Sequence, residues 1–97
     1  MDFEEFKKSL SDSTPLNDSS AYLESLWYDA KGDWNRAHEI IQNIEDKTAG
    51  WIHSYLHRKE GDLSNASYWY QRAGKPTARN SLAAEWDEIS STLLNKK

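Results

Sequence analysis

The sequence predicts an all-α fold of about six helices, arranged as two helical hairpins with a flanking helix at each end. Apolar residues recur at helical spacing along almost the whole chain. Only two prolines and four glycines interrupt its 97 residues. No stretch alternates polar and apolar residues for long enough to propose a strand. Because this length is typical of one domain, we expect residues 1–97 to share a single core.

The first segment, residues 1–17, is expected to form a short amphipathic helix followed by a polar linker. Phe3, Phe6 and Leu10 fall on one face of that helix. The linker begins near Ser11. We expect the apolar face to cover one end of the hairpins.

The first hairpin is expected over residues 18–46. The polar run at 18–20 supplies candidate N-caps for its first helix. Gly32 can adopt the positive φ that ends a helix, and Asp33 can cap the next one. That second helix is expected to end near Glu45.

The second hairpin is expected over residues 47–76, with its first helix at about 48–60. Gly61 and Asp62 repeat the signal that ends one helix and caps the next. The second helix of this hairpin is expected to end at Gly74, just before a proline.

The last segment, residues 77–97, is expected to be a capping helix over about 79–95. Its apolar residues share one face and its opposite face is polar, as a terminal helix of a repeat requires. They are Leu82, Ala83, Trp86, Ile89 and Leu93.

The two hairpins are related by an internal repeat with an offset of 29 residues. The matched pairs include Gly32 with Gly61, Asp33 with Asp62, Ala37 with Ala66, Ile41 with Tyr70, and Gln42 with Gln71. Such a unit cannot bury its apolar face alone, so the two copies are expected to stack.

These residues resemble the tetratricopeptide repeat, in the turn glycine Gly61, the small Ala66 and the aromatic Tyr70 four residues later. The stretch 69–73 is also similar to the Sel1-like variant. The resemblance implies that the first helix of each hairpin lines a concave surface that binds a ligand. The partner-binding residues that it implies are Tyr22, Leu26, Asp29, Trp51, Tyr55 and Arg58.

The expected function is therefore that of a small non-enzymatic adaptor that binds a peptide or a protein partner. Aromatic side chains beside an arginine suit peptide recognition, because they offer a large contact area at low entropic cost. Two alternatives stay open for the same rings. They could pack against the flanking helices as core, or they could form a homodimer.

A second function class rests on His53, His57 and Glu60, which share one face of a helix. Two imidazoles and a carboxylate could hold zinc, and His38 could add a third imidazole. We expect these histidines to pack the hairpin and to bind no metal. The alternative is a small-molecule-binding, metal-binding or catalytic protein that uses this face.

Net charge and composition limit the classes of partner that we expect. The net charge of −4 disfavours nucleic acid, although residues 47–84 carry six basic and only two acidic side chains. That basic segment suits an acidic peptide or a phosphate group. The chain has no phosphate-binding glycine-rich loop and no catalytic motif, so we expect no enzyme activity and no cofactor.

Three further features predict where in the cell the protein is located. The chain has no cysteine and therefore no disulfide framework. No apolar run approaches the ~18 residues of a membrane span. The acidic start lacks the basic and apolar regions of a signal peptide. A soluble cytoplasmic protein without a membrane partner is the expectation.

Overall fold

The computed structural model describes residues 1–95, and this part of the chain contains six α-helices, one 3-10 turn and no strand. The elements are α1 (Phe3–Lys8), η1 (Ser9–Ser11), α2 (Ala21–Ala30), α3 (Trp34–Ile41), α4 (Lys47–Glu60), α5 (Leu63–Ala73) and α6 (Leu82–Asn95). The prediction of an all-α fold with about six helices is confirmed. The last two positions of the predicted segment 77–97 lie outside the described residues.

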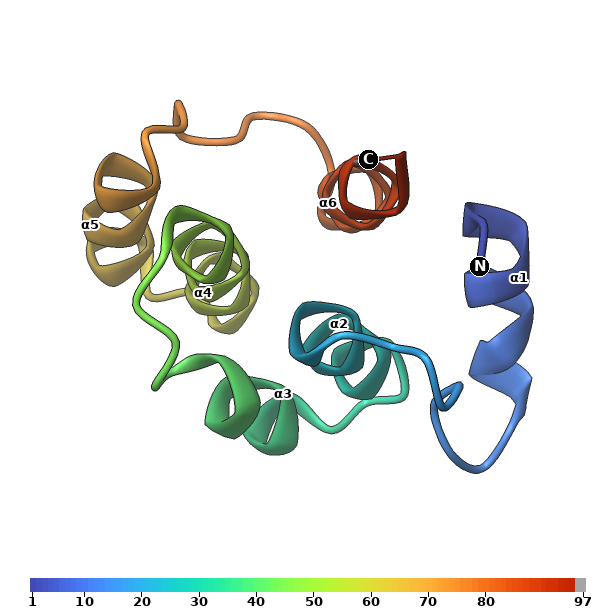
Figure 1. Ribbon diagram of the computed structural model, residues 1–97. Coiled ribbons are helices and arrows are strands. Elements are labelled where there is room, and N and C mark those ends of the chain that lie inside the picture. Colours follow the sequence, from blue (N-terminus) through green and yellow to red (C-terminus); the bar gives the residue numbers. More distant parts are fainter. Residues whose placement is uncertain (96–97) are drawn as a thin grey trace.

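The helices form two hairpins, α2 with α3 and α4 with α5, and α2 lies next to α4 (Figure 1). Helix α6 packs on both α2 and α4, on the side away from α3 and α5. Helix α1 lies at the far end of the molecule, against α6. Within the described part of the chain, no helix is long and apolar enough to cross a bilayer.

The turn inside each hairpin has the predicted chemistry. Gly32 has φ of +89° and Gly61 has φ of +88°, a conformation that costs glycine little and other residues more. The Asp33 and Asp62 side chains then each accept a hydrogen bond from the backbone N–H three residues on. The prediction that glycine ends one helix and aspartate caps the next is confirmed in both hairpins.

Two helix boundaries differ from the predicted ones. Helix α3 ends at Ile41 rather than near Glu45, because the chain must turn and become extended before Asp46 can cap α4. Helix α6 begins at Leu82, three residues later than predicted. The Ser81 hydroxyl accepts a hydrogen bond from the backbone N–H three residues on, which fixes that start.

One apolar cluster joins all six helices. Its fully buried members include Phe6, Leu26, Ile41, Ile52, Leu56 and Ile89. Phe6 of α1 stacks on Trp86 of α6 with ring centroids 5.6 Å apart, and the Trp27 indole N–H donates to the Ser9 carbonyl oxygen. Aromatic side chains therefore join α1 to α6, and the turn after α1 to the first hairpin.

Candidate functional site

The face of α2 and α4 that the sequence marks as a binding groove is covered by α6. Leu26, Asp29 and Tyr55 are at most 3% exposed, and Trp51 is 7% exposed. The indole N–H of Trp86 in α6 donates to the Leu26 carbonyl oxygen at 3.0 Å. In this arrangement a partner cannot reach the first three of these side chains.

Asp29 is the centre of a buried polar group beneath α6. Its carboxylate accepts hydrogen bonds from the Tyr55 hydroxyl at 2.9 Å and from the Lys59 ammonium at 3.0 Å. Burial and the adjacent Asp29 carboxylate raise the pKa of Tyr55, so its hydroxyl stays protonated and donates. The hydrogen bond between Tyr55 and Asp29 therefore holds α4 against α2.

Arg58 and Glu85 fasten α6 to the second hairpin. The Arg58 guanidinium donates to the Glu85 carboxylate at 2.9 Å and also to the Asn80 carbonyl oxygen. The Tyr70 hydroxyl donates to the other oxygen of Glu85 at 2.6 Å. Glu85 is 1% exposed. Arg58, predicted to bind a partner, instead binds a carboxylate of its own chain.

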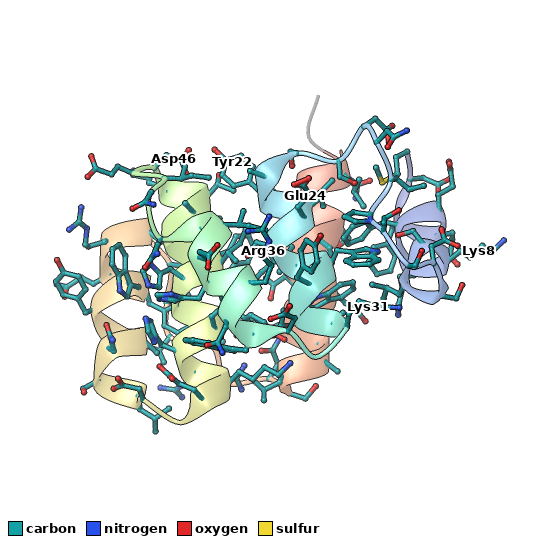
Figure 2. The ribbon with its side chains drawn as sticks, turned by 90° about the horizontal axis from the view of Figure 1, so that it is seen from below. Lys8, Tyr22, Glu24, Lys31, Arg36 and Asp46 are labelled. Carbon is teal, nitrogen blue, oxygen red and sulfur yellow. The ribbon has the colours of Figure 1, made fainter. Side chains whose placement is uncertain are left out.

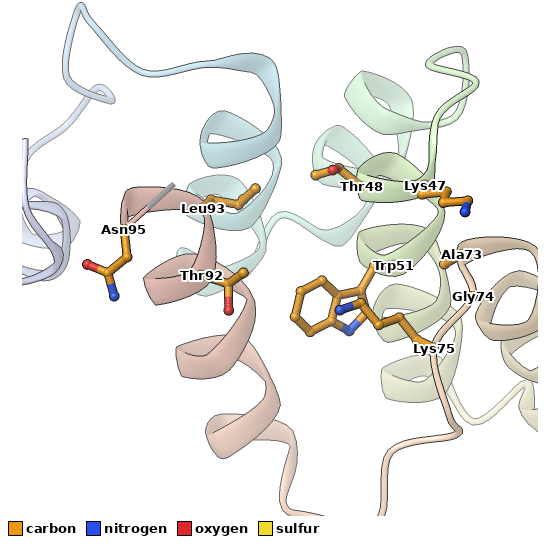
Figure 3. Close-up of a pocket in the computed structure, with 9 residues that line it drawn as sticks. All are labelled: Lys47, Thr48, Trp51, Ala73, Gly74, Lys75, Thr92, Leu93 and Asn95. Atoms are coloured by element: carbon orange, nitrogen blue, oxygen red, sulfur yellow. The ribbon is translucent and has the colours of Figure 1, made fainter. Parts of the chain in front are cut away.

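An open cleft of about 760 Å³ lies between α4, the end of α5 and the last turns of α6. Figure 3 shows Trp51 and Lys75 facing Thr92 and Leu93 of α6. The lining residues are Lys47, Thr48, Trp51, Ala73, Gly74, Lys75, Thr92, Leu93 and Asn95. Among the six predicted partner-binding residues, Trp51 is the one that lines this cleft.

The cleft continues into two smaller hollows that share lining residues with it. One extends past Lys47 and Leu93 to Tyr22. The other extends past Lys75 to Arg79, where the carboxylates of Glu85 and Glu88 also lie. The result is a groove along α4 and α6 whose central part is lined by lysine ammonium groups and apolar atoms.

Tyr22 and Asp46 fix one end of this groove. They lie side by side where α2 and α4 begin (Figure 2), and the Tyr22 hydroxyl donates to the Asp46 carboxylate. This hydrogen bond raises the pKa of Tyr22. Because the other carboxylate oxygen of Asp46 caps α4, its charge is already compensated at the groove end.

Three histidines converge between α3 and α4. The Nε2 atoms of His38 and His53 are 3.0 Å apart, and one ring nitrogen from each of His38, His53 and His57 lies within 4.8 Å of the others. His57 Nδ1 lies 2.5 Å from a carboxylate oxygen of Glu60. The structure therefore brings together the residues of the second function class, including His38 from the other hairpin.

Tryptophans wall the histidine cluster on two sides. Trp34 stacks on His38 with centroids 4.9 Å apart, and Trp69 stacks on His53 at 4.0 Å. Burial, together with the neighbouring His57 and His38, lowers the pKa of His53 to about 4. Burial and His57 also lower the pKa of His38. Both rings are therefore neutral at pH 7.

Sequence reasoning did not find the cleft, and it named His38 only as an imidazole that could join His53 and His57. Lys47 begins α4 and Lys75 follows α5, so the two lysines meet at the cleft only because these helices pack together. His38 reaches His53 only because the first hairpin packs on the second. The local signals are the four-residue spacings of His53 with His57 and of Trp34 with His38, which place each pair on one face of a helix.

Comparison of the chain with protein-family models, with curated proteins and with solved structures gave no match. The tetratricopeptide resemblance therefore rests on the sequence pattern alone.

Proposed function

We propose that this chain is a small, non-enzymatic, tetratricopeptide-like module that binds an acidic peptide segment of a partner protein in the cleft between α4 and α6. The observation that carries the proposal is the lining of the cleft. It combines one indole with two lysine ammonium groups, and the nine described residues around it include no carboxylate. Such a surface favours a ligand with both an apolar and an anionic part.

The charge of the cleft supports an acidic ligand. The Lys75 ammonium lies 4.1 Å from the centroid of the Trp51 ring, a cation–π distance. This contact holds the ammonium at the cleft before any partner arrives, which lowers the entropic cost of binding a carboxylate. Lys47 adds a second cation in the first turn of α4.

The apolar part of the lining supports a peptide over a free small anion. Trp51, Ala73 and Leu93 line the same hollow, so an apolar side chain of a peptide could bind between them. Aromatic anchors of this kind carry much of the binding energy at protein interfaces. The acidic residues on either side of that anchor would then contact Lys47 and Lys75.

The covered face of α4 offers an internal precedent for this chemistry. Helix α6 presents Glu85 to Arg58 on that face, whereas its Trp86 donates to the Leu26 carbonyl oxygen of α2. The second hairpin thus already binds a carboxylate from a helix packed against it. An acidic peptide in the cleft would make a similar contact between a cation and a carboxylate on the neighbouring surface of α4.

A selection from a displayed library of random peptides tests the proposal. The wild-type chain is expected to enrich peptides with an aromatic or aliphatic residue flanked by Asp or Glu. Lys75→Glu should lose this enrichment, because it reverses one charge in the cleft. The control is Lys8→Glu on α1, which changes the net charge by the same amount but lies away from the cleft (Figure 2). This variant should retain the enrichment of acidic peptides.

Two results would contradict the proposal. One is a wild-type selection without acidic enrichment. The other is an enrichment that Lys75→Glu and Lys8→Glu reduce equally, because that would show a response to net charge rather than to the cleft.

A further inference from the structure

The histidine cluster between the hairpins has the spacing of a metal site. Two nitrogen ligands of one tetrahedral zinc ion lie about 3.3 Å apart, because each Zn–N bond is about 2.0–2.1 Å long. His38 Nε2 and His53 Nε2 are 3.0 Å apart, and a nitrogen of His57 lies within 4.8 Å of both. The three nitrogens therefore converge at a spacing close to that of the ligands of a single ion.

The environment of His57 matches that of a zinc-bound histidine. Its Nδ1 is hydrogen-bonded to the Glu60 carboxylate at 2.5 Å, which leaves Nε2 as the nitrogen available to a metal. A carboxylate on the far nitrogen of a ligating imidazole fixes the tautomer and makes the metal-facing nitrogen more basic. Glu60 would thus be a positioning residue that acts through His57.

Two of the three rings, those of His38 and His53, are also held in place by neighbouring tryptophans. Trp34 and Trp69 stack on these two rings, and the Trp34 indole N–H donates to the Leu56 carbonyl oxygen at 2.8 Å. Their orientations are therefore fixed by the core.

We propose that His38, His53 and His57 bind one Zn²⁺ ion through three imidazole nitrogens, with water as the fourth ligand. Three histidines with an open fourth position are a known donor set for this ion. His38 belongs to the first hairpin and the other two ligands to the second. The ion therefore joins the two hairpins, independently of the cleft and of the proposed peptide binding.

Titration of the chelator-treated full chain with zinc alone, followed by calorimetry at pH 7.5, tests the site. We expect one ion per chain. His38→Gln should weaken binding by more than a hundredfold because it removes a ligand. Glu60→Gln should weaken it by roughly ten- to a hundredfold, as expected when a ligating histidine loses its carboxylate partner. Glu39→Gln, on the exposed face of α3, should leave the affinity unchanged.

Cobalt provides a second readout that does not depend on the variants folding. Three imidazoles and a water should give Co²⁺ the intense visible absorption of tetrahedral coordination, and stacked Trp34 and Trp69 should lose fluorescence on binding. An octahedral Co²⁺ spectrum would overturn the proposal. So would a zinc affinity that His38→Gln and Glu39→Gln leave equal, because the histidines would then only pack the core.

Discussion

Arg58 of α4 and Glu85 of α6 form an ion pair of 2.9 Å in which the carboxylate is 1% exposed. Tyr70 completes the coordination of that carboxylate from α5. The pair lies on the face that the tetratricopeptide resemblance assigns to a ligand. It makes α6 part of the folded core and leaves the cleft beside Trp51 open.

Glu85→Gln should destabilise the chain by about 3 kcal/mol, because removing one partner of a buried pair leaves the other charge uncompensated. Tyr70 would keep an acceptor, which limits the loss. Urea denaturation measures the change. Glu88→Gln, exposed on the same helix, should stay within about 0.5 kcal/mol of wild type. Equal effects of the two substitutions would show that the ion pair does not hold α6.

Gly50 of α4 packs against Ala73 of α5. A Cβ at this position would lie 3.4 Å from the Cβ of Ala73, at the edge of ordinary contact. Alanine has the higher helix propensity, which alone would raise the free energy of unfolding by ~1 kcal/mol. Because of the contact with Ala73, Gly50→Ala should change the free energy of unfolding by less than this amount. Gly50→Val should lower it by about 1–3 kcal/mol, because its extra methyl groups overpack the contact. Thermal unfolding of both variants tests this, and a Val variant as stable as the Ala variant would contradict it.

Acid should destabilise the chain through His53. The folded pKa is about 4, and the unfolded value is about 6.5. The unfolded chain therefore binds the proton first, so stability falls from about pH 6.5 to pH 4, by up to about 3 kcal/mol. The titratable groups that face the His53 ring are His38 and His57, and Glu60 is hydrogen-bonded to His57 beside them.

Urea denaturation at several pH values, with chelator present, measures this slope. His53→Gln is neutral throughout the range and should flatten the slope between pH 6.5 and pH 4.5. A variant with the wild-type slope would show that other groups carry the acid response.

Local signals in the sequence were enough to predict the fold class and both hairpins. Gly32 and Gly61 adopt positive φ, and Asp33 and Asp62 cap the helices that follow. These features depend on residues three or four apart, so they can be read from spacing alone. The end of α3 was missed because Asp46 caps the next helix and shortens this one.

The candidate site depends on contacts between distant segments and was predicted only in part. Helical spacing places Trp51 on the first helix of the second hairpin, but it cannot say that α6 lies over Leu26 and Tyr55. The amphipathic pattern of α6 fits a cap on any apolar surface. The surface that it covers depends on contacts between distant residues, among them the Arg58 and Glu85 pair, whose members are 27 residues apart.

The most direct test of the proposed function is an NMR titration of the ¹⁵N-labelled chain with a short acidic peptide that contains one aromatic residue. The indole N–H signal of Trp51 and the amide of Lys75 should shift. The indole signals of Trp27, Trp34 and Trp86 should stay in place, because these groups donate to backbone carbonyls in the core.

A peptide with each acidic residue replaced by lysine is the matched control and should cause no shift. Shifts of Trp51 and Lys75 that saturate with the acidic peptide alone would agree with binding in the cleft. An unchanged Trp51 signal at saturating peptide, or equal shifts with the lysine peptide, would contradict it.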